Sequence, residues 1–219
     1  LDTLVEHFKA RRFEKVEKIA ISLTKHYPNH AFGWKALAIA FKQNGKIIES
    51  LNANKKVIEI NPNDSEAYFN LANTFKLLNK SNQAEINYKK AIKLNPKNNT
   101  FYNNLALLFH ENKQYEEAKI NYEKDIKLNP KFFEAYNNLG VTLKDLNKLK
   151  ESINAYKKAI SLNQNFADAF NNLGIAFKQQ GKFEEAELNY KKAIEINSSY
   201  SEAYSNLGIL LREKGELEK

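Results

Sequence analysis

The chain has 219 residues, of which 42% are hydrophobic, and it carries 34 lysines and arginines against 26 aspartates and glutamates. It contains no cysteine, which excludes disulfides, thiolate metal sites and thiol nucleophiles. No apolar run approaches the roughly 18 residues that a membrane span needs, and the first twelve residues have no signal-peptide core, so we expect a soluble, cytoplasmic protein without a membrane partner.

The positive charge is concentrated in the N-terminal half. Residues 1–98 contain 17 basic and 9 acidic side chains, whereas residues 99–219 contain 17 of each. Such an excess would attract an acidic partner or a nucleic acid. The lysines stand singly or in pairs such as Lys89–Lys90, however, without the interleaved aromatic residues of many nucleic-acid interfaces. We therefore interpret most of them as solvated helix faces.

The sequence repeats itself every 34 residues without a gap. Taken in chain order, the units are a partial unit 1–30, five full units (31–64, 65–98, 99–132, 133–166 and 167–200) and a partial unit 201–219. In each full unit the apolar residues follow helical spacing twice, with a break between the two stretches. A repeat of this length predicts a single all-α solenoid over residues 1–219, built of antiparallel helix pairs.

The unit 65–98 shows the pattern most clearly. A first apolar stripe includes Tyr68 and Phe75, and Asn79 interrupts it. A second stripe includes Tyr88, and Pro96 prevents the helix from continuing. The sequence therefore predicts two helices per unit, joined by a short turn.

The eighth residue of each unit is small. The residues at this position are Ala72, Ala106, Gly140, Gly174 and Gly208. A larger side chain would separate two closely crossing helices. Glycine has a low helix propensity, but it allows the two helices to approach closely. We predict that the paired helices cross at this position.

Counted within each unit, the recurring pattern is an aromatic residue at position 4, leucine at 7, glycine or alanine at 8, alanine at 20 and 27, tyrosine at 24 and proline at 32. This pattern resembles the tetratricopeptide repeat, which implies a right-handed superhelical solenoid. The stretches Tyr136–Gly140 and Phe170–Gly174 resemble, more narrowly, the repeats of O-linked N-acetylglucosamine transferase and of bacterial proteins built like it.

Asp125 departs from the pattern, because it occupies the usually small position 27 of its unit. An unpaired carboxylate is costly when it is buried between helices. Two interpretations stay open: a local rotation that lets the side chain reach water or a lysine, and a buried functional carboxylate.

In the resembling family the first helix of each pair lines a concave groove, which implies that positions 2, 5, 6, 9, 12 and 13 face a ligand. Position 6 is asparagine in five consecutive units: Asn70, Asn104, Asn138, Asn172 and Asn206. Position 5 adds three more: Asn103, Asn137 and Asn171. A side-chain amide both donates and accepts, so it pairs with the backbone of an extended peptide whatever its sequence.

Position 12 is basic in six consecutive units: Lys42, Lys76, His110, Lys144, Lys178 and Arg212. This row would favour an acidic protein or peptide partner. An alternative stays open for both rows, because asparagine is abundant throughout the chain and cations near a helix C-terminus also interact favourably with the helix dipole.

The sequence predicts no catalytic residue, metal site or cofactor. It contains no nucleophile motif, phosphate-binding loop or acidic metal cluster, and only His26 and His30 have the spacing of metal ligands. Gly45, Gly181 and Gly215 are predicted to lie in turns.

We therefore expect a protein-interaction scaffold rather than an enzyme, and the resemblance implies a substrate-recruiting N-terminal region of a larger transferase. Two alternatives remain. The chain stops after the turn predicted at Gly215, so an uncapped C-terminal end would drive self-assembly into a homo-oligomer. The basic N-terminal half would, less favourably, bind nucleic acid.

Overall fold

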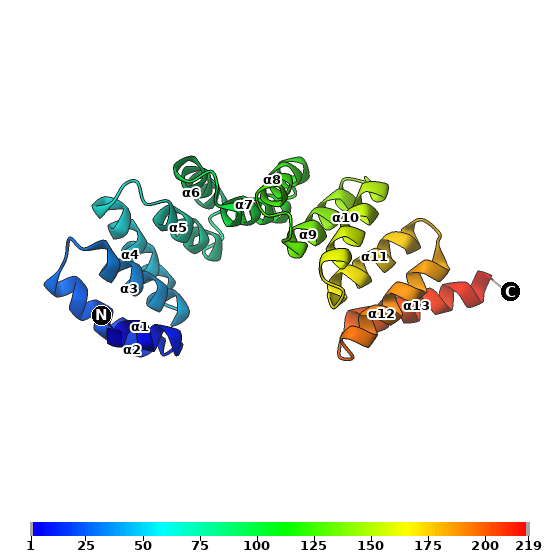
Figure 1. The fold of residues 1–219 in the computed structure, drawn as a ribbon, viewed down its shortest axis with the longest axis horizontal. Coiled ribbons are helices and arrows are strands. Elements are labelled where there is room, and N and C mark those ends of the chain that lie inside the picture. The colour runs from blue at the N-terminus through cyan, green and yellow to red at the C-terminus, as the bar shows by residue number, and fades with distance from the viewer. Residues whose placement is uncertain (1, 218–219) are drawn as a thin grey trace. The chain divides into compact units, whose positions relative to one another are not determined.

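The computed structural model describes residues 2–217, and these residues form thirteen α-helices and no β-strand (Figure 1). The helices are α1 (Asp2–Lys9), α2 (Phe13–His26), α3 (Ala31–Gln43), α4 (Ile47–Ile60), α5 (Ser65–Leu77), α6 (Ser81–Leu94), α7 (Asn99–Glu111), α8 (Tyr115–Leu128), α9 (Phe133–Asp145), α10 (Leu149–Leu162), α11 (Ala167–Gln179), α12 (Phe183–Ile196) and α13 (Ser201–Leu217). None of them is long and apolar enough to cross a membrane.

The helices alternate between two kinds that recur with the sequence repeat. The odd-numbered helices from α3 to α11 are the first helices of the units, and each spans 13 residues. The even-numbered helices from α4 to α12 are the second helices, and each spans 14 residues. Each first helix begins at the first residue of a 34-residue unit. The predicted all-α fold of helical repeats is confirmed.

The chain forms two compact parts, residues 1–108 and 109–219. Within each part, helices that follow one another along the chain pack together. In the second part the first helices α9, α11 and α13 also contact one another in succession. The apolar core of this part includes Ile153, Leu173, Phe177 and Leu210.

The small residue at position 8 lies where the paired helices cross, as predicted. The tyrosines at position 24 that face it are almost completely buried: Tyr88, Tyr122, Tyr156 and Tyr190. A Cβ atom placed on Gly140 would lie 2.5 Å from Cε1 of Tyr156, and one on Gly174 would lie 2.6 Å from Cε1 of Tyr190. At Gly140 and Gly174 the tyrosine ring therefore occupies the space that a Cβ atom would need.

The turn inside each unit contains one residue with a positive φ. These residues are Arg11, Gly45, Asn79, Lys113, Asn147 and Gly181, one at position 15 of each unit from 1–30 to 167–200. After Lys113 (φ 60°) the backbone N–H of Gln114 donates to the carbonyl oxygen of Phe109 at 2.8 Å, which closes the end of α7. A side chain in the left-handed region costs about 1–2 kcal/mol, so lysine is strained where glycine would not be.

We expect Lys113→Gly to raise the free energy of unfolding by about 0.5–1 kcal/mol, because relief of the left-handed strain exceeds the entropic cost of glycine. Gly181→Ala, at the equivalent turn (φ 72°), should lower it by about 1 kcal/mol. Urea denaturation measures both changes. Lys158→Gly, in the middle of α10, is the control and should be destabilising by about 1 kcal/mol. A loss of stability in Lys113→Gly would contradict the prediction.

One expectation from the sequence is wrong. Gly215 does not form a turn, because α13 continues through it to Leu217. At the equivalent residue Gly181 the chain turns because the second helix α12 packs back against α11. No second helix follows α13 in the described part of the chain. Of the interpretations of Asp125, contact with water is excluded, because the residue is fully buried. Burial, with smaller contributions from the charges of Glu111 and Asp125, raises the pKa of the neighbouring Tyr122.

Candidate functional site

One face of the first helices carries most of the residues that the sequence singled out. We call it the first-helix face and define it by positions 2, 6, 9, 12 and 13 of each unit. In the second part of the chain it extends over three adjacent helices, α9, α11 and α13. Its central residues Asn138, Asn172 and Asn206 are half-buried, so their amides line the surface without projecting far into solvent.

The asparagines of successive repeats form hydrogen bonds with one another. The Nδ2 atom of Asn172 on α11 donates to Oδ1 of Asn137 on α9 at 3.0 Å. The Nδ2 atom of Asn206 on α13 donates in the same way to Oδ1 of Asn171 on α11 at 3.0 Å. We call these two contacts the amide pairs. In each of them position 6 of one repeat is bonded to position 5 of the repeat before it.

The position-5 members of the amide pairs do not face a ligand, which corrects the sequence-based expectation for Asn137 and Asn171. Asn137 is 7% exposed and Asn171 is fully buried. Both lie on the side of their helix that packs against the next first helix, where Asn171 Nδ2 also donates to Oε1 of Glu202 at 3.2 Å. They therefore position the amides of Asn172 and Asn206.

The first part of the chain has no amide pair among its described residues. Position 5 is Phe69 in α5, and its ring stacks on Phe101 with the ring centroids 4.9 Å apart. Asn70 and Asn104 are half-buried, and the Nδ2 atom of Asn104 donates to the carbonyl oxygen of Thr100 in its own helix at 2.9 Å. Asn103 is also half-buried. The row of asparagines is therefore continuous in sequence but not in its hydrogen bonding.

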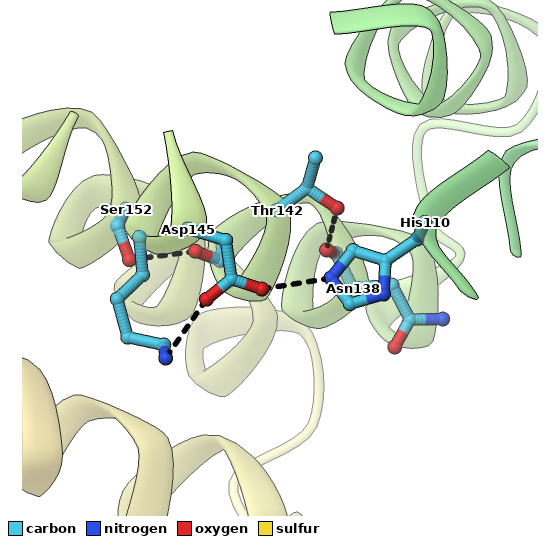
Figure 2. A network of polar contacts seen from close by, with 7 residues as sticks. His110, Asn138, Thr142, Asp145 and Ser152 are labelled. Carbon is cyan, nitrogen blue, oxygen red and sulfur yellow. Dashed lines mark hydrogen bonds and ion pairs between the residues drawn. The ribbon is translucent and has the colours of Figure 1, made fainter. Parts of the chain in front are cut away.

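The basic row at position 12 is partly neutralised by carboxylates at position 13 of the following repeat. Nζ of Lys178 lies 2.8 Å from Oε1 of Glu213, and Nε2 of His110 lies 3.0 Å from Oδ2 of Asp145 (Figure 2). Asp145 also contacts Nζ of Lys144 at 3.1 Å. These acids were not predicted from the sequence, although each follows its basic partner by 35 residues, a spacing that the sequence shows.

The remaining basic residues of the row differ in their surroundings. Lys42 and Lys76 are half-buried, and Arg212 on α13 is exposed. Lys42 pairs with no carboxylate in the part of the chain that the structure describes. The row is thus less uniform, and less strongly basic, than the sequence suggested.

Family models match most of the repeats. One model of the tetratricopeptide repeat matches residues 53–86, 87–120 and 189–219, a second matches residues 167–200, and a third model of the same repeat matches residues 142–181. The chain is a tetratricopeptide-repeat protein. The narrower likeness to the transferase repeats stays a prediction. A comparison with curated proteins found no match.

Solved structures of tetratricopeptide-repeat proteins share this fold. YrrB, described as having an unusual peptide-binding site, is 19% identical with a TM-score of 0.71, over 85% of this chain and 96% of that chain. MamA from Desulfovibrio magneticus RS-1 is 21% identical with a TM-score of 0.72, over 78% and 96% of the two chains. Cut9, in the APC/C hetero-tetramer Cut9–Hcn1, is 19% identical with a TM-score of 0.73, over 96% and 42%.

The first-helix face of these tetratricopeptide repeats presents hydrogen-bonding groups in fixed orientations. Each amide nitrogen of Asn172 and Asn206 uses one N–H in its amide pair, which leaves the second N–H and the carbonyl oxygen to bind a ligand. Among the described residues no group of three His, Cys, Asp or Glu side chains is arranged to hold a metal ion. The arrangement is suited to binding a polar chain.

Proposed function

We propose that this tetratricopeptide-repeat protein is a protein-interaction scaffold, and that a segment of its partner binds in an extended conformation across the first-helix face of α9, α11 and α13. The observation that carries the proposal is the pair of hydrogen bonds that orient Asn172 and Asn206. An amide that is already oriented loses less conformational entropy when it binds a ligand. The peptide-binding site described for YrrB, which has the same fold, supports the proposal.

The spacing of the repeats suits an extended polypeptide. Packed helices lie about 8–10 Å apart, and an extended chain advances about 3.3 Å per residue, so successive amides meet about every third residue of the ligand. Each hydrogen bond contributes only about 0.5–1.5 kcal/mol, so several repeats must act together. Position 9 adds apolar contacts from Val141, Ile175 and Ile209 between the amides.

The charges of the face do not demand a strongly acidic ligand. Asp145 and Glu213 already accept contacts from the basic row, and Glu202 lies at the other edge. Hydrogen bonds to the ligand backbone, rather than charge, therefore supply most of the expected recognition. We propose a segment of mixed composition as the partner.

The test is binding of extended peptides from a library, followed by fluorescence anisotropy, in wild type and in the double variant Asn172→Ala/Asn206→Ala. Loss of two hydrogen-bonding groups should weaken binding about tenfold or more. Asn189→Ala is the matched control, because this amide bonds only to its own helix, at the carbonyl oxygen of Glu185. Unchanged binding in the double variant would contradict the proposal.

A second experiment separates ligand binding from the structural role of the same amides. A peptide that binds wild type is resynthesised with N-methyl groups at every third residue, which remove backbone N–H donors and leave the protein unaltered. We expect affinity to fall about tenfold, relative to the unmethylated peptide, when the methyl groups are in the register of the amides. In the other two registers we expect a smaller loss of affinity. Equal affinity in all three registers would mean that the amides do not bind the ligand backbone.

Self-association is a second candidate, favoured by the apolar side chains that α13 exposes. Tyr204 is 51% exposed and Leu211 is 47% exposed. Burial of such side chains against another copy would be favourable. A molecular mass that rises with protein concentration in sedimentation equilibrium would support this candidate, and a constant monomer mass would exclude it.

A further inference from the structure

A pocket of about 650 Å³ lies where two successive repeats meet, between α10 and the turn that joins α11 to α12. Its apolar lining includes Ile153 and Phe177. Three lysines also line it: Lys150, Lys157 and Lys182. Its volume falls in the usual range of ligand-binding pockets. No acidic residue is among its lining residues.

The three lysines of this pocket have no acidic residue among the other lining residues. The Nζ atoms of Lys157 and Lys182 lie 5.7 Å and 5.9 Å from the centre of the same Phe177 ring. The ring attracts each of these cations. Neither they nor Lys150 form an ion pair with any residue in the range 2–217. An anion in the pocket would balance the charge of these lysines.

The first junction between repeats has the same arrangement with a carboxylate inside it. Lys46 corresponds to Lys182, and its Nζ atom lies 5.8 Å from the ring of Phe41, which corresponds to Phe177. The pocket there, about 350 Å³, is lined by Glu17, whose carboxylate accepts hydrogen bonds from Lys46 at 2.5 Å and from Asn44 at 2.7 Å. The chain itself therefore supplies the anion at this junction.

Two further junctions also contain their own carboxylates. Lys148 donates to Oε1 of Glu116 at 2.8 Å, and this hydrogen bond lowers the pKa of Glu116 below its ordinary value. Lys214 contacts Glu184 at 3.2 Å and Glu187 at 3.0 Å. In α10 the residues equivalent to Glu116 and Glu17 are Lys150 and Ile153. Compared with the junctions of Glu17 and Glu116, the pocket thus keeps the lysine at position 16 but lacks the acid.

We propose that this pocket binds an acidic segment of a protein partner. A carboxylate of the partner takes the place that Glu17 and Glu116 occupy at their junctions, between Lys150 and Lys182. An apolar side chain of the same segment packs on Ile153 and Phe177. The segment is acidic and partly apolar because the lining combines three cations with apolar side chains.

A polypeptide fits the surroundings of the pocket better than a nucleic acid does. Glu151 follows Lys150 on α10, and Glu184 and Glu185 follow Lys182 at the start of α12; all three side chains are exposed. These acids interrupt the continuous basic track that a phosphate backbone needs. A short run of carboxylates requires only the local cluster of lysines.

This inference concerns a different surface from the proposed function, and the two fail separately. The pocket is formed mainly by α10 and by the turn after α11, and it shares Gln179 with the first-helix face, which is the proposed peptide site. The double variant Asn172→Ala/Asn206→Ala should leave binding to the pocket unchanged, and substitution of Lys150 should leave binding to the first-helix face unchanged.

The decisive variant is Lys150→Glu. It recreates the arrangement of Glu116 and Lys148. The introduced carboxylate then neutralises Lys182 and occupies the place proposed for the partner's carboxylate. The probe is a short fluorescent peptide of alternating glutamate and leucine, measured by anisotropy. We expect the variant to bind it at least about tenfold more weakly than wild type.

Two controls keep the test specific. Lys158→Glu makes the same change in net charge on the same helix, outside the pocket, and should alter affinity by less than about twofold. Lys46→Gln, at the first junction, should also leave binding unchanged. Circular dichroism establishes that each variant is folded, and Lys157→Gln serves as a second pocket variant, expected to weaken binding as well.

Three results would overturn the proposal. They are equal binding of the same peptide with glutamine in place of glutamate, equal binding by wild type and Lys150→Glu, and failure of wild type to bind the peptide. Single-stranded DNA and tripolyphosphate are tested in parallel. If either binds with dependence on Lys150 while the peptide does not, the pocket is a phosphate site and the proposal is wrong.

Discussion

Replacing Gly140 with alanine is expected to lower the free energy of unfolding by about 1–3 kcal/mol, the usual cost of overpacking a core. The added Cβ would lie 2.5 Å from Cε1 of Tyr156, whose side chain is fully buried. The α9–α10 pair must therefore separate. Urea denaturation followed by helical circular dichroism measures the loss. Gly174→Ala should behave alike, because its Cβ would meet Tyr190 at 2.6 Å.

Gly208→Ala provides the matched control, because it makes the same chemical change at the same position of the last repeat. A Cβ atom there meets nothing within 4 Å. Alanine has the higher helix propensity, so this variant should be more stable by about 0.5–1 kcal/mol. If all three variants changed stability in the same direction, crossing of the helices would not explain the small residue at position 8.

Replacing Asn171 with alanine is expected to lower the free energy of unfolding by about 1–3 kcal/mol, because a buried amide is lost and its partners keep unsatisfied polar groups. Asn171 is fully buried, accepts a hydrogen bond from Asn206 and donates one to Glu202. Its removal leaves both partners without their contact between α11 and α13. Urea denaturation of the single variant measures this effect.

A double-mutant cycle isolates the amide pair itself. Asn171→Ala and Asn206→Ala, singly and together, should show a coupling energy of about 0.5–1.5 kcal/mol. Asn189→Ala is the control, because its amide bonds only within α12 and its loss should change stability by less than about 0.5 kcal/mol. A coupling energy near zero would mean that the contact between Asn171 and Asn206 does not stabilise the packing of the repeats.

Neighbouring repeats in the second part are joined by polar contacts of two kinds. The amide pairs join position 6 to position 5, and the ion pair of Lys178 with Glu213 joins position 12 to position 13. The hydrogen bond between His110 and Asp145 joins the same two positions (Figure 2). Both kinds lie on the proposed ligand face. A ligand that bonds to these side chains would therefore also change the stability of the packing between successive repeats. It would do so by replacing the contacts between the repeats or by adding hydrogen bonds to the same side chains.

The sequence by itself determined the repeat and what depends on local periodicity. The period, the two helices per unit and the crossing at position 8 follow from which residues recur at helical spacing, and the positions of Tyr156 and Gly140 confirm them. The family was also readable, because its pattern consists of core residues within each unit. These features arise inside one helix pair.

Only the tertiary structure decided what happens between repeats. Helical periodicity placed Asn171 and Asn172 on one exposed face, but packing buries the first and leaves the second at the surface. The packing of the repeats also brings Lys178 next to Glu213 and leaves Lys182 without an acidic partner. The physical reason is that helical spacing fixes which residues share a face, whereas the crossing of successive first helices decides which of them meet the next repeat.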